Sequence, residues 1–191
     1  MKHLVRLENN LRFPTKDGIK PEIAFINSHD RSAGFNFFAG FLRLACMNGC
    51  LVGTSLGDFK VRHIGEKPEH ILEYVHQVLE MFPTMNDRIQ EFRRVTLNQY
   101  QEKDFIEQAL RLRWKEGKEP SNAVAKMLHP RRPDDTGHDL FTVYQKTQEN
   151  LIKGVRVWPT GTIRPLNAVD KQVKVNRRLW DLAEKTYQLA A

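Results

Sequence analysis

Residues 21–52 read PEIAFINSHDRSAGFNFFAGFLRLACMNGCLV, and this stretch decides which fold the sequence predicts. Its first apolar run, Ile23–Ile26, is short and contains β-branched and aromatic residues, as is typical of a buried strand. Its second run, Phe35–Cys46, is rich in phenylalanine and is followed by Asn48-Gly49. Asn-Gly favours a tight turn because both residues tolerate a positive φ angle. We therefore predict strands joined by turns here, rather than a helix.

Polar residues interrupt these apolar runs at the ends of the predicted strands. Together with a histidine farther along the chain, they form a candidate polar cluster: Asn27, His29, Asp30, Arg43, Asn48 and His63. An arginine inside the run Phe41–Leu44 needs an anionic partner or an open cleft, because an unpaired buried charge is costly. Two interpretations stay open: Asp30 pairs with Arg43 in a structural scaffold, or the cluster is a binding site.

The rest of the chain changes from strand-like to helix-like patterns. Leu4–Leu7 and Phe59–Ile64 alternate apolar and polar residues, as half-buried strands do. From Pro68 onward the apolar residues recur at helical spacing, most clearly along Ile71–Phe82. Residues 129–138 are rich in proline and charge, so we expect an exposed loop there.

Strands first and helices afterwards predict an α+β fold. We expect a single domain over residues 1–191, with mainly strands in residues 1–66 and mainly helices in residues 67–191. The strands would form an antiparallel sheet, and the helices would pack on one of its faces.

Composition indicates a soluble globular protein. A chain of 191 residues buries roughly 70% of its unfolded surface, so it needs neither a metal nor a disulfide for stability. We expect no membrane partner, because no apolar segment approaches the ~18 residues of a transmembrane helix and no signal peptide follows Met1. The two cysteines, Cys46 and Cys50, fit a reducing cytoplasm, and whether they pair stays open, as does the oligomeric state.

The net charge of +7 is unevenly distributed. Residues 1–50 carry +3 and residues 151–191 carry +5, whereas residues 51–100 carry −1 and residues 101–150 are neutral. Concentrated positive charge indicates an anionic partner, above all nucleic acid.

The C-terminal segment is the best candidate for contacting nucleic acid. The residues expected to do so are Arg156, Trp158, Arg164, Lys171, Lys174, Arg177 and Arg178. Cations on a helix neutralise phosphates, and a nearby aromatic ring stacks on unpaired bases. The alternative is an ordinary solvated helical face, which is what most charged stripes are. No helix-turn-helix, zinc finger or ribonucleoprotein motif is present, so binding would act mainly on the backbone.

Other kinds of site have weaker support. Ser28-His29-Asp30 is not a catalytic triad, because neighbouring strand residues point to opposite faces. A metal site at His29, Asp30, His63 and a cysteine lacks a complete ligand pattern, so we expect neither metal nor other cofactor. No glycine-rich phosphate loop of a standard type occurs, which argues against nucleotide hydrolysis.

Several segments resemble a known family. They are Ile26–Ser32, Phe41–Gly49, Arg62-His63, Tyr144–Gly154 and Val175–Trp180. In these segments the chain is similar to the phage/plasmid-like domain of unknown function 932 family, and the resemblance extends over most of the chain. It implies a phage- or plasmid-borne protein in a bacterial cytoplasm, and it implies no settled activity. Because residues of the polar cluster carry part of the resemblance, we slightly favour a binding site over a structural scaffold for that cluster.

Together these observations favour an accessory protein of a mobile element that binds nucleic acid or a nucleic-acid-containing host complex. Single-strand DNA handling and interference with host defence, such as CRISPR, are the settings we expect. One alternative is an enzyme with a pocket around His29, Asp30 and His63. A second is a protein that inhibits a host defence complex without contacting nucleic acid.

Overall fold

The computed structural model describes residues 2–8, 19–28, 35–43, 48–51, 59–61, 73, 76–77, 79–157 and 161–190. The chain divides into two compact units, residues 1–86 and residues 87–191. The prediction of a single domain over the whole chain therefore stays a prediction.

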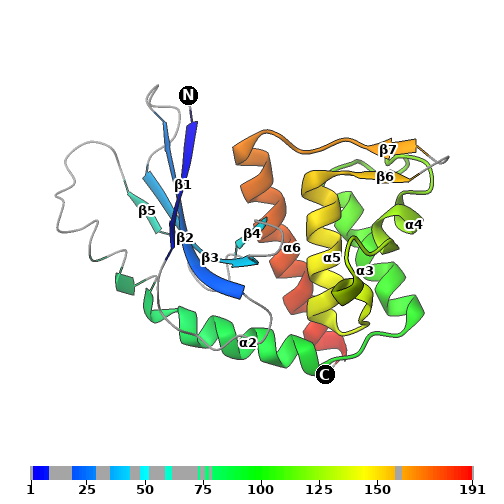
Figure 1. The fold of residues 1–191 in the computed structure, drawn as a ribbon, viewed down its shortest axis with the longest axis horizontal. Helices are drawn as coiled ribbons and strands as arrows, with labels where there is room; N and C mark the ends of the chain where they lie inside the picture. Colours follow the sequence, from blue (N-terminus) through cyan, green and yellow to red (C-terminus); the bar gives the residue numbers. More distant parts are fainter. Residues whose placement is uncertain are drawn as a thin grey trace. The chain divides into compact units, whose positions relative to one another are not determined.

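The first unit contains a five-stranded antiparallel sheet (Figure 1). Its strands are β1 (Lys2–Glu8), β2 (Ile19–Ser28), β3 (Phe35–Arg43), β4 (Asn48–Leu51) and β5 (Phe59–Val61). The order is β1-β2-β3-β4, and β5 also pairs with β3. Strand β3 pairs with β5 through Phe35–Phe37 and with β4 through Gly40–Arg43, so the two short strands share one edge of β3.

The second unit is mainly helical. Its elements are α2 (Phe82–Arg94), which starts in the first unit, then α3 (Gln99–Arg111), α4 (Ala123–Leu128), the 3₁₀-helix η2 (Pro133–Thr136), α5 (Leu140–Lys153), β6 (Val155–Val157), β7 (Gly161–Ile163) and α6 (Val169–Ala190). Strands β6 and β7 form a two-stranded antiparallel hairpin. The chain thus has both helices and antiparallel strands, as an α+β class requires. The packing of the helices on one face of the first sheet stays a prediction.

Local signals in the sequence explain several helix ends. Asn98 accepts hydrogen bonds from the backbone N–H groups of Tyr100 and Gln101, and the Gln101 side chain accepts one from the Asn98 N–H, which forms a capping box for α3. Asp139 caps α5 by accepting from the Thr142 N–H. Helix α5 ends at Lys153, and the next residue, Gly154, has a φ of 73°, which disfavours other residues.

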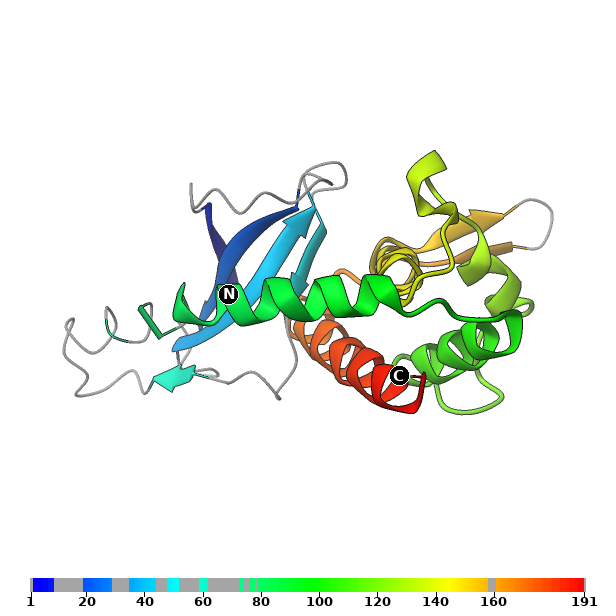
Figure 2. The ribbon, with the colours of Figure 1, turned by 90° about the horizontal axis from the view of Figure 1, so that it is seen from below.

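The core of the second unit forms around α5. This helix contacts α3, α4, α6 and η2, and all its residues except Thr142 and Lys153 are buried. Figures 1 and 2 show α6 along one side of α5 and the β6–β7 hairpin at its C-terminal end. Trp180 of α6 lies at the centre, with its ring 5.3 Å from Phe92 and 5.8 Å from Tyr144, in an edge-on arrangement with the tyrosine.

Among the described residues, no helix combines the length and the apolar character that crossing a membrane requires.

Candidate nucleic-acid interface

The polar side chains of α5 are turned into the protein, and several of them bind neighbouring elements. The consecutive residues concerned are Gln145, Lys146, Thr147, Gln148, Glu149 and Asn150, all buried. Asn150 donates to the backbone carbonyls of Met127 and His129, at 3.0 and 3.2 Å. Gln148 donates to the side-chain oxygen of Asn176 on α6 at 2.8 Å. Because its polar groups face inward, α5 is not a helix that could read base edges in a groove.

A buried carboxylate joins α3 to α5. Glu102 is 3% exposed, and its two oxygens lie 2.7 Å from the Lys146 Nζ and 3.0 Å from the His138 Nδ1. Burial by itself would raise the pKa of Glu102, but the hydrogen bonds and charges of Lys146 and His138 outweigh it and lower the pKa below its usual value. Glu102 therefore stays ionised and fully engaged inside the unit.

A second buried carboxylate, Glu149, anchors the segment of residues 129–138. Its oxygen Oε1 lies 3.0 Å from Arg132 Nη2 and 3.3 Å from Lys153 Nζ. Burial raises the pKa of Glu149, and these two cations reverse that effect and lower it. Next to this pair, the Arg131 Nε donates to Asn150 Oδ1 at 2.8 Å.

The segment predicted as an exposed loop is thus only partly exposed. The exposed residues in it are His129, Arg131, Pro133, Thr136 and His138, whereas Asp135 is 1% exposed and Arg132 is half-buried. The exposure predicted from proline and charge is wrong at Asp135 and incomplete at Arg132. Arg132 lies between Asp135 and the buried Glu149 of α5, so these charges neutralise one another inside the protein.

The hairpin turns one basic face outward. Val155 pairs with Ile163 and Arg156 pairs with Thr162 across the two strands. Since successive strand residues alternate between faces, Val155 and Ile163 share the inner face and are buried. Arg156, Thr162 and Arg164 share the outer face, where all three are exposed. We call these three residues the hairpin face.

A second basic surface runs along α6. Lys171, Lys174, Arg178 and Lys185 are all exposed, and at 3.6 residues per turn they fall within a sector of about 60°. We call these four residues the α6 stripe. The buried residues of the helix, such as Val173 and Trp180, lie on its opposite side. Lys185 was not among the residues predicted from the sequence, although extending the same helical spacing by two turns reaches it.

The cations of these two surfaces lack ion-pair partners in the part of the chain that the structure describes. The residues concerned are Arg156, Arg164, Lys171, Lys174, Arg178 and Lys185. Most other cations of the second unit are engaged: Arg88, for example, pairs with Glu184 at 3.3 Å, and Arg93 lies over the ring of Phe141. Unengaged exposed cations are the groups free to take up phosphate oxygens.

Two further residues predicted for this interface have different positions. Arg177 is half-buried, and helical spacing places it among Asp170, Asp181 and Glu184 rather than in the α6 stripe. Trp158 lies outside the described residues.

The polar cluster predicted near the first strands is described only in part. Asn27 lies in β2, and Arg43 of β3 is the register partner of Asn48 of β4. The backbone thus brings Arg43 and Asn48 together. His29, Asp30 and His63 lie outside the described residues, so the pairing of Asp30 with Arg43 and the pocket proposed for an enzyme stay predictions.

A pocket of about 270 Å³ lies between the end of α3 and α4, and the sequence did not indicate it. Its lining residues are Glu107, Leu110, Arg111, Glu116, Glu119 and Val124. Three carboxylates against one guanidinium make it unsuitable for a phosphate. Among the described residues, no group of three or more histidine, cysteine, aspartate and glutamate side chains is placed to hold a metal ion.

Comparison with known proteins confirms the family resemblance. The family model described as "Domain of unknown function (DUF932)" matches residues 1–180. Two relatives from Escherichia coli (strain K12) are the UPF0380 protein YfjQ, 33% identical over 189 residues, and the UPF0380 protein YafZ, 32% identical over 188 residues. Each alignment covers 96% of this chain and 68% of the relative. No solved structure matches the chain.

Proposed function

This chain belongs to the DUF932 family, and from that premise we propose that it binds the phosphate backbone of nucleic acid through the cations of residues 151–191. The observation that carries the proposal is the α6 stripe, whose four exposed cations have no ion-pair partner among the described residues. Six of the seven net positive charges belong to residues 87–191, where twenty lysines and arginines face fourteen aspartates and glutamates. Such a surface attracts a polyanion.

The chemistry favours the backbone over the bases as the recognised part. Lysine and arginine side chains without an accompanying set of amide groups contact phosphates and carry little sequence information. The polar residues of α5, which would be needed for reading bases, are committed to internal partners such as Asn176 and Glu102. Binding should therefore be tolerant of sequence and sensitive to salt.

The size of the α6 stripe sets the expected salt dependence. Lys171 and Lys185 are separated by fourteen residues, or about 21 Å along the helix. If its four cations each neutralise one phosphate, log K should fall with log salt at a slope of about −2.8 for a single strand and about −3.6 for a duplex.

The test is a salt titration of the full chain with fluorescently labelled single- and double-stranded oligonucleotides, followed by anisotropy between about 50 and 200 mM salt. The stripe variant carries Lys171→Gln, Lys174→Gln and Arg178→Gln. Its matched control carries Arg94→Gln, Lys115→Gln and Lys118→Gln, which removes the same charge from exposed residues elsewhere in the second unit.

We expect the stripe variant to lose about 2 to 3 units of salt slope, because three phosphate contacts disappear. The control variant should keep the slope of the parent chain. Equal losses in both variants would mean that only the total charge matters. Failure of the parent chain to bind either oligonucleotide at the lowest salt would refute the proposal.

The setting that we propose is a phage- or plasmid-borne accessory protein in the bacterial cytoplasm, acting in single-strand handling or against a host defence complex. The family resemblance supports this setting. We also keep, as part of the proposal, the arrangement in which helices of residues 67–191 cover one face of the antiparallel sheet.

A further inference from the structure

The hairpin face is a separate basic surface with a rigid base. Arg156 lies diagonally across the hairpin from Arg164, because Thr162 is the partner of Arg156 and Arg164 follows it by two residues. Diagonal neighbours on one face of an antiparallel pair lie within about 8 Å, so both guanidinium groups reach the same stretch of a phosphate backbone.

Several contacts fix this base to the end of α5. The Arg113 guanidinium donates to the Leu151 carbonyl and, at 3.1 Å, to the Arg164 carbonyl. The Leu166 N–H donates to the Ile152 carbonyl at 2.8 Å. Gly154 approaches the other strand so closely that a Cβ atom there would lie 2.9 Å from the Arg164 carbonyl carbon. The two arginines are therefore presented by a preorganised backbone, which reduces the cost of ordering on binding.

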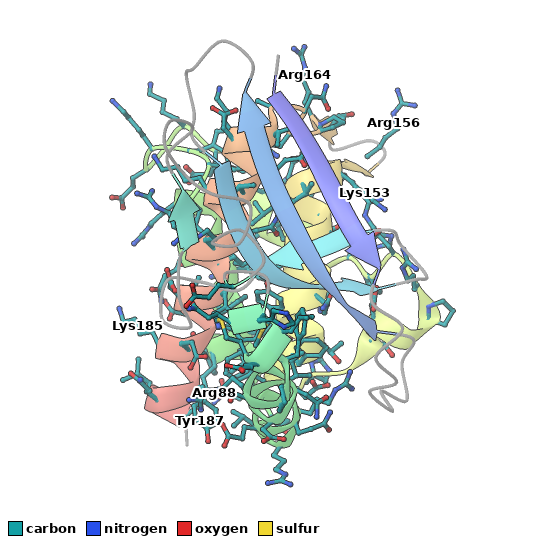
Figure 3. The ribbon with its side chains drawn as sticks, turned by 90° about the vertical axis from the view of Figure 1, so that its left-hand side faces the viewer. Arg88, Lys153, Arg156, Arg164, Lys185 and Tyr187 are labelled. Carbon is teal, nitrogen blue, oxygen red and sulfur yellow. The ribbon has the colours of Figure 1, made fainter. Side chains whose placement is uncertain are left out.

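The hairpin face and Lys185, at the C-terminal end of the α6 stripe, lie in different parts of the second unit. Figure 3 shows Lys185 at the left of the view, Arg156 at the upper right and Arg164 near the top. Along α6, one flank of the stripe carries Asp170, Asp181 and Glu184 together with Arg177, and the buried face lies on the other flank. A backbone that follows the stripe toward Lys185 therefore leads away from the hairpin face.

We propose that one chain binds two separate segments of nucleic acid, one along the α6 stripe and one on the hairpin face, and thereby holds the two together. This inference rests on the proposed backbone binding, which concerns only the stripe. The hairpin face takes the second segment through charge-assisted hydrogen bonds from Arg156 and Arg164 to phosphate oxygens, with the Thr162 hydroxyl beside them.

The test uses two non-complementary single-stranded oligonucleotides, so that base pairing cannot join them. One is immobilised on beads and the other is fluorescent, and the signal is the amount of the second captured by the full chain. A hairpin variant, Arg156→Gln with Arg164→Gln, is compared with a charge-matched control, Lys115→Gln with Lys118→Gln. Light scattering gives the oligomeric state of each, and anisotropy at saturation gives the number of oligonucleotides per chain.

We expect the parent chain and the control variant to capture the second oligonucleotide with two bound per chain. The hairpin variant should keep its affinity for one oligonucleotide within about threefold, because the stripe is intact, while capture falls at least about tenfold. If the parent binds one oligonucleotide and captures no second, this inference fails and the proposed function stands. If the hairpin variant still captures, bridging arises from self-association through the stripe, and the inference fails as well. If the parent binds no oligonucleotide, both fail.

Discussion

Replacing Lys146 with methionine should leave the Glu102 carboxylate without its main partner inside the protein. Methionine keeps most of the volume of the lysine stem, so the change is chiefly electrostatic. Glu102 and Lys146 are both about 4% exposed in their side chains and lie 2.7 Å apart. Breaking such a buried pair costs about 3 to 5 kcal/mol. We expect the lower end, about 3 kcal/mol, because His138 still contacts the carboxylate.

This loss should appear as a lower melting temperature and a lower free energy of unfolding. For a chain of 191 residues, about 3 kcal/mol corresponds to a decrease of roughly 6 to 12 °C in Tm. The matched control is Lys103→Met on the same helix as Glu102, because Lys103 and Glu107 are 3.7 Å apart but exposed. Its expected cost is below about 0.5 kcal/mol.

The pH dependence separates this reasoning from a general packing defect. In the parent chain the pKa of Glu102 is lowered by folding, so the ionised carboxylate stabilises the folded protein. This stabilisation is fully present above the pKa that Glu102 has in the unfolded chain, and it is lost as the pH falls through the lower pKa of the folded protein. Without Lys146, only His138 still opposes the effect of burial, so we expect the pKa of Glu102 to rise. The deficit of the variant should then be largest at neutral pH and should shrink as acid protonates the carboxyl group.

Urea denaturation of the parent, Lys146→Met and Glu102→Gln/Lys146→Met between about pH 4 and pH 7 measures this directly. The double variant should recover at least half of the loss at neutral pH, because no charge is left buried without a partner. A deficit of equal size at every pH, or no recovery in the double variant, would refute the electrostatic explanation.

Three further predictions concern other parts of the second unit. Gly154→Ala should lower the free energy of unfolding, measured by urea denaturation, by about 3 kcal/mol, because the new Cβ would overlap the backbone of Ile163. The control Gly117→Ala has a similar φ of 72° but nothing within 4 Å of the new Cβ, so it should cost about 1 kcal/mol. Equal costs would contradict the close approach at Gly154. Thr147→Val should stabilise the protein by about 1 kcal/mol, since the buried Thr147 hydroxyl makes no hydrogen bond to a described residue, and a loss of stability would show that it has a partner. Burial raises the pKa of Glu184, so the ionised carboxylate opposes folding at neutral pH. Glu184→Gln should therefore be at least as stable as the parent chain at pH 7, and this advantage should disappear as acid protonates Glu184 in the parent. A stability difference that does not change with pH would exclude this cause.

The arrangement of charge along the chain could be predicted from the sequence, because charge is a property of each residue. The excess of cations after residue 150 and the helical spacing of Lys171, Lys174 and Arg178 follow from residue types and a period of 3.6. The signals that set the two ends of α5 are also local, since Asp139 supplies the N-terminal cap and Gly154 the positive φ. The family resemblance belongs here too, because it rests on segments of the sequence itself.

The burial of charge could not be predicted in this way. Glu102 and Lys146 are 44 residues apart, as Arg132 and Glu149 are 17 apart, and no local rule says that such residues will meet. A polar run such as Gln145–Asn150 looks like a solvent-facing helix until its partners on α4, α6 and η2 are in place.

The sequence by itself therefore determined which residues carry positive charge and which of them share a face of a helix. Only the tertiary structure decided which cations pair with buried carboxylates and which remain exposed on the hairpin face and the α6 stripe. The physical reason is that neutralising a charge in the interior requires a partner within about 4 Å, and that distance is set by packing between segments distant in sequence.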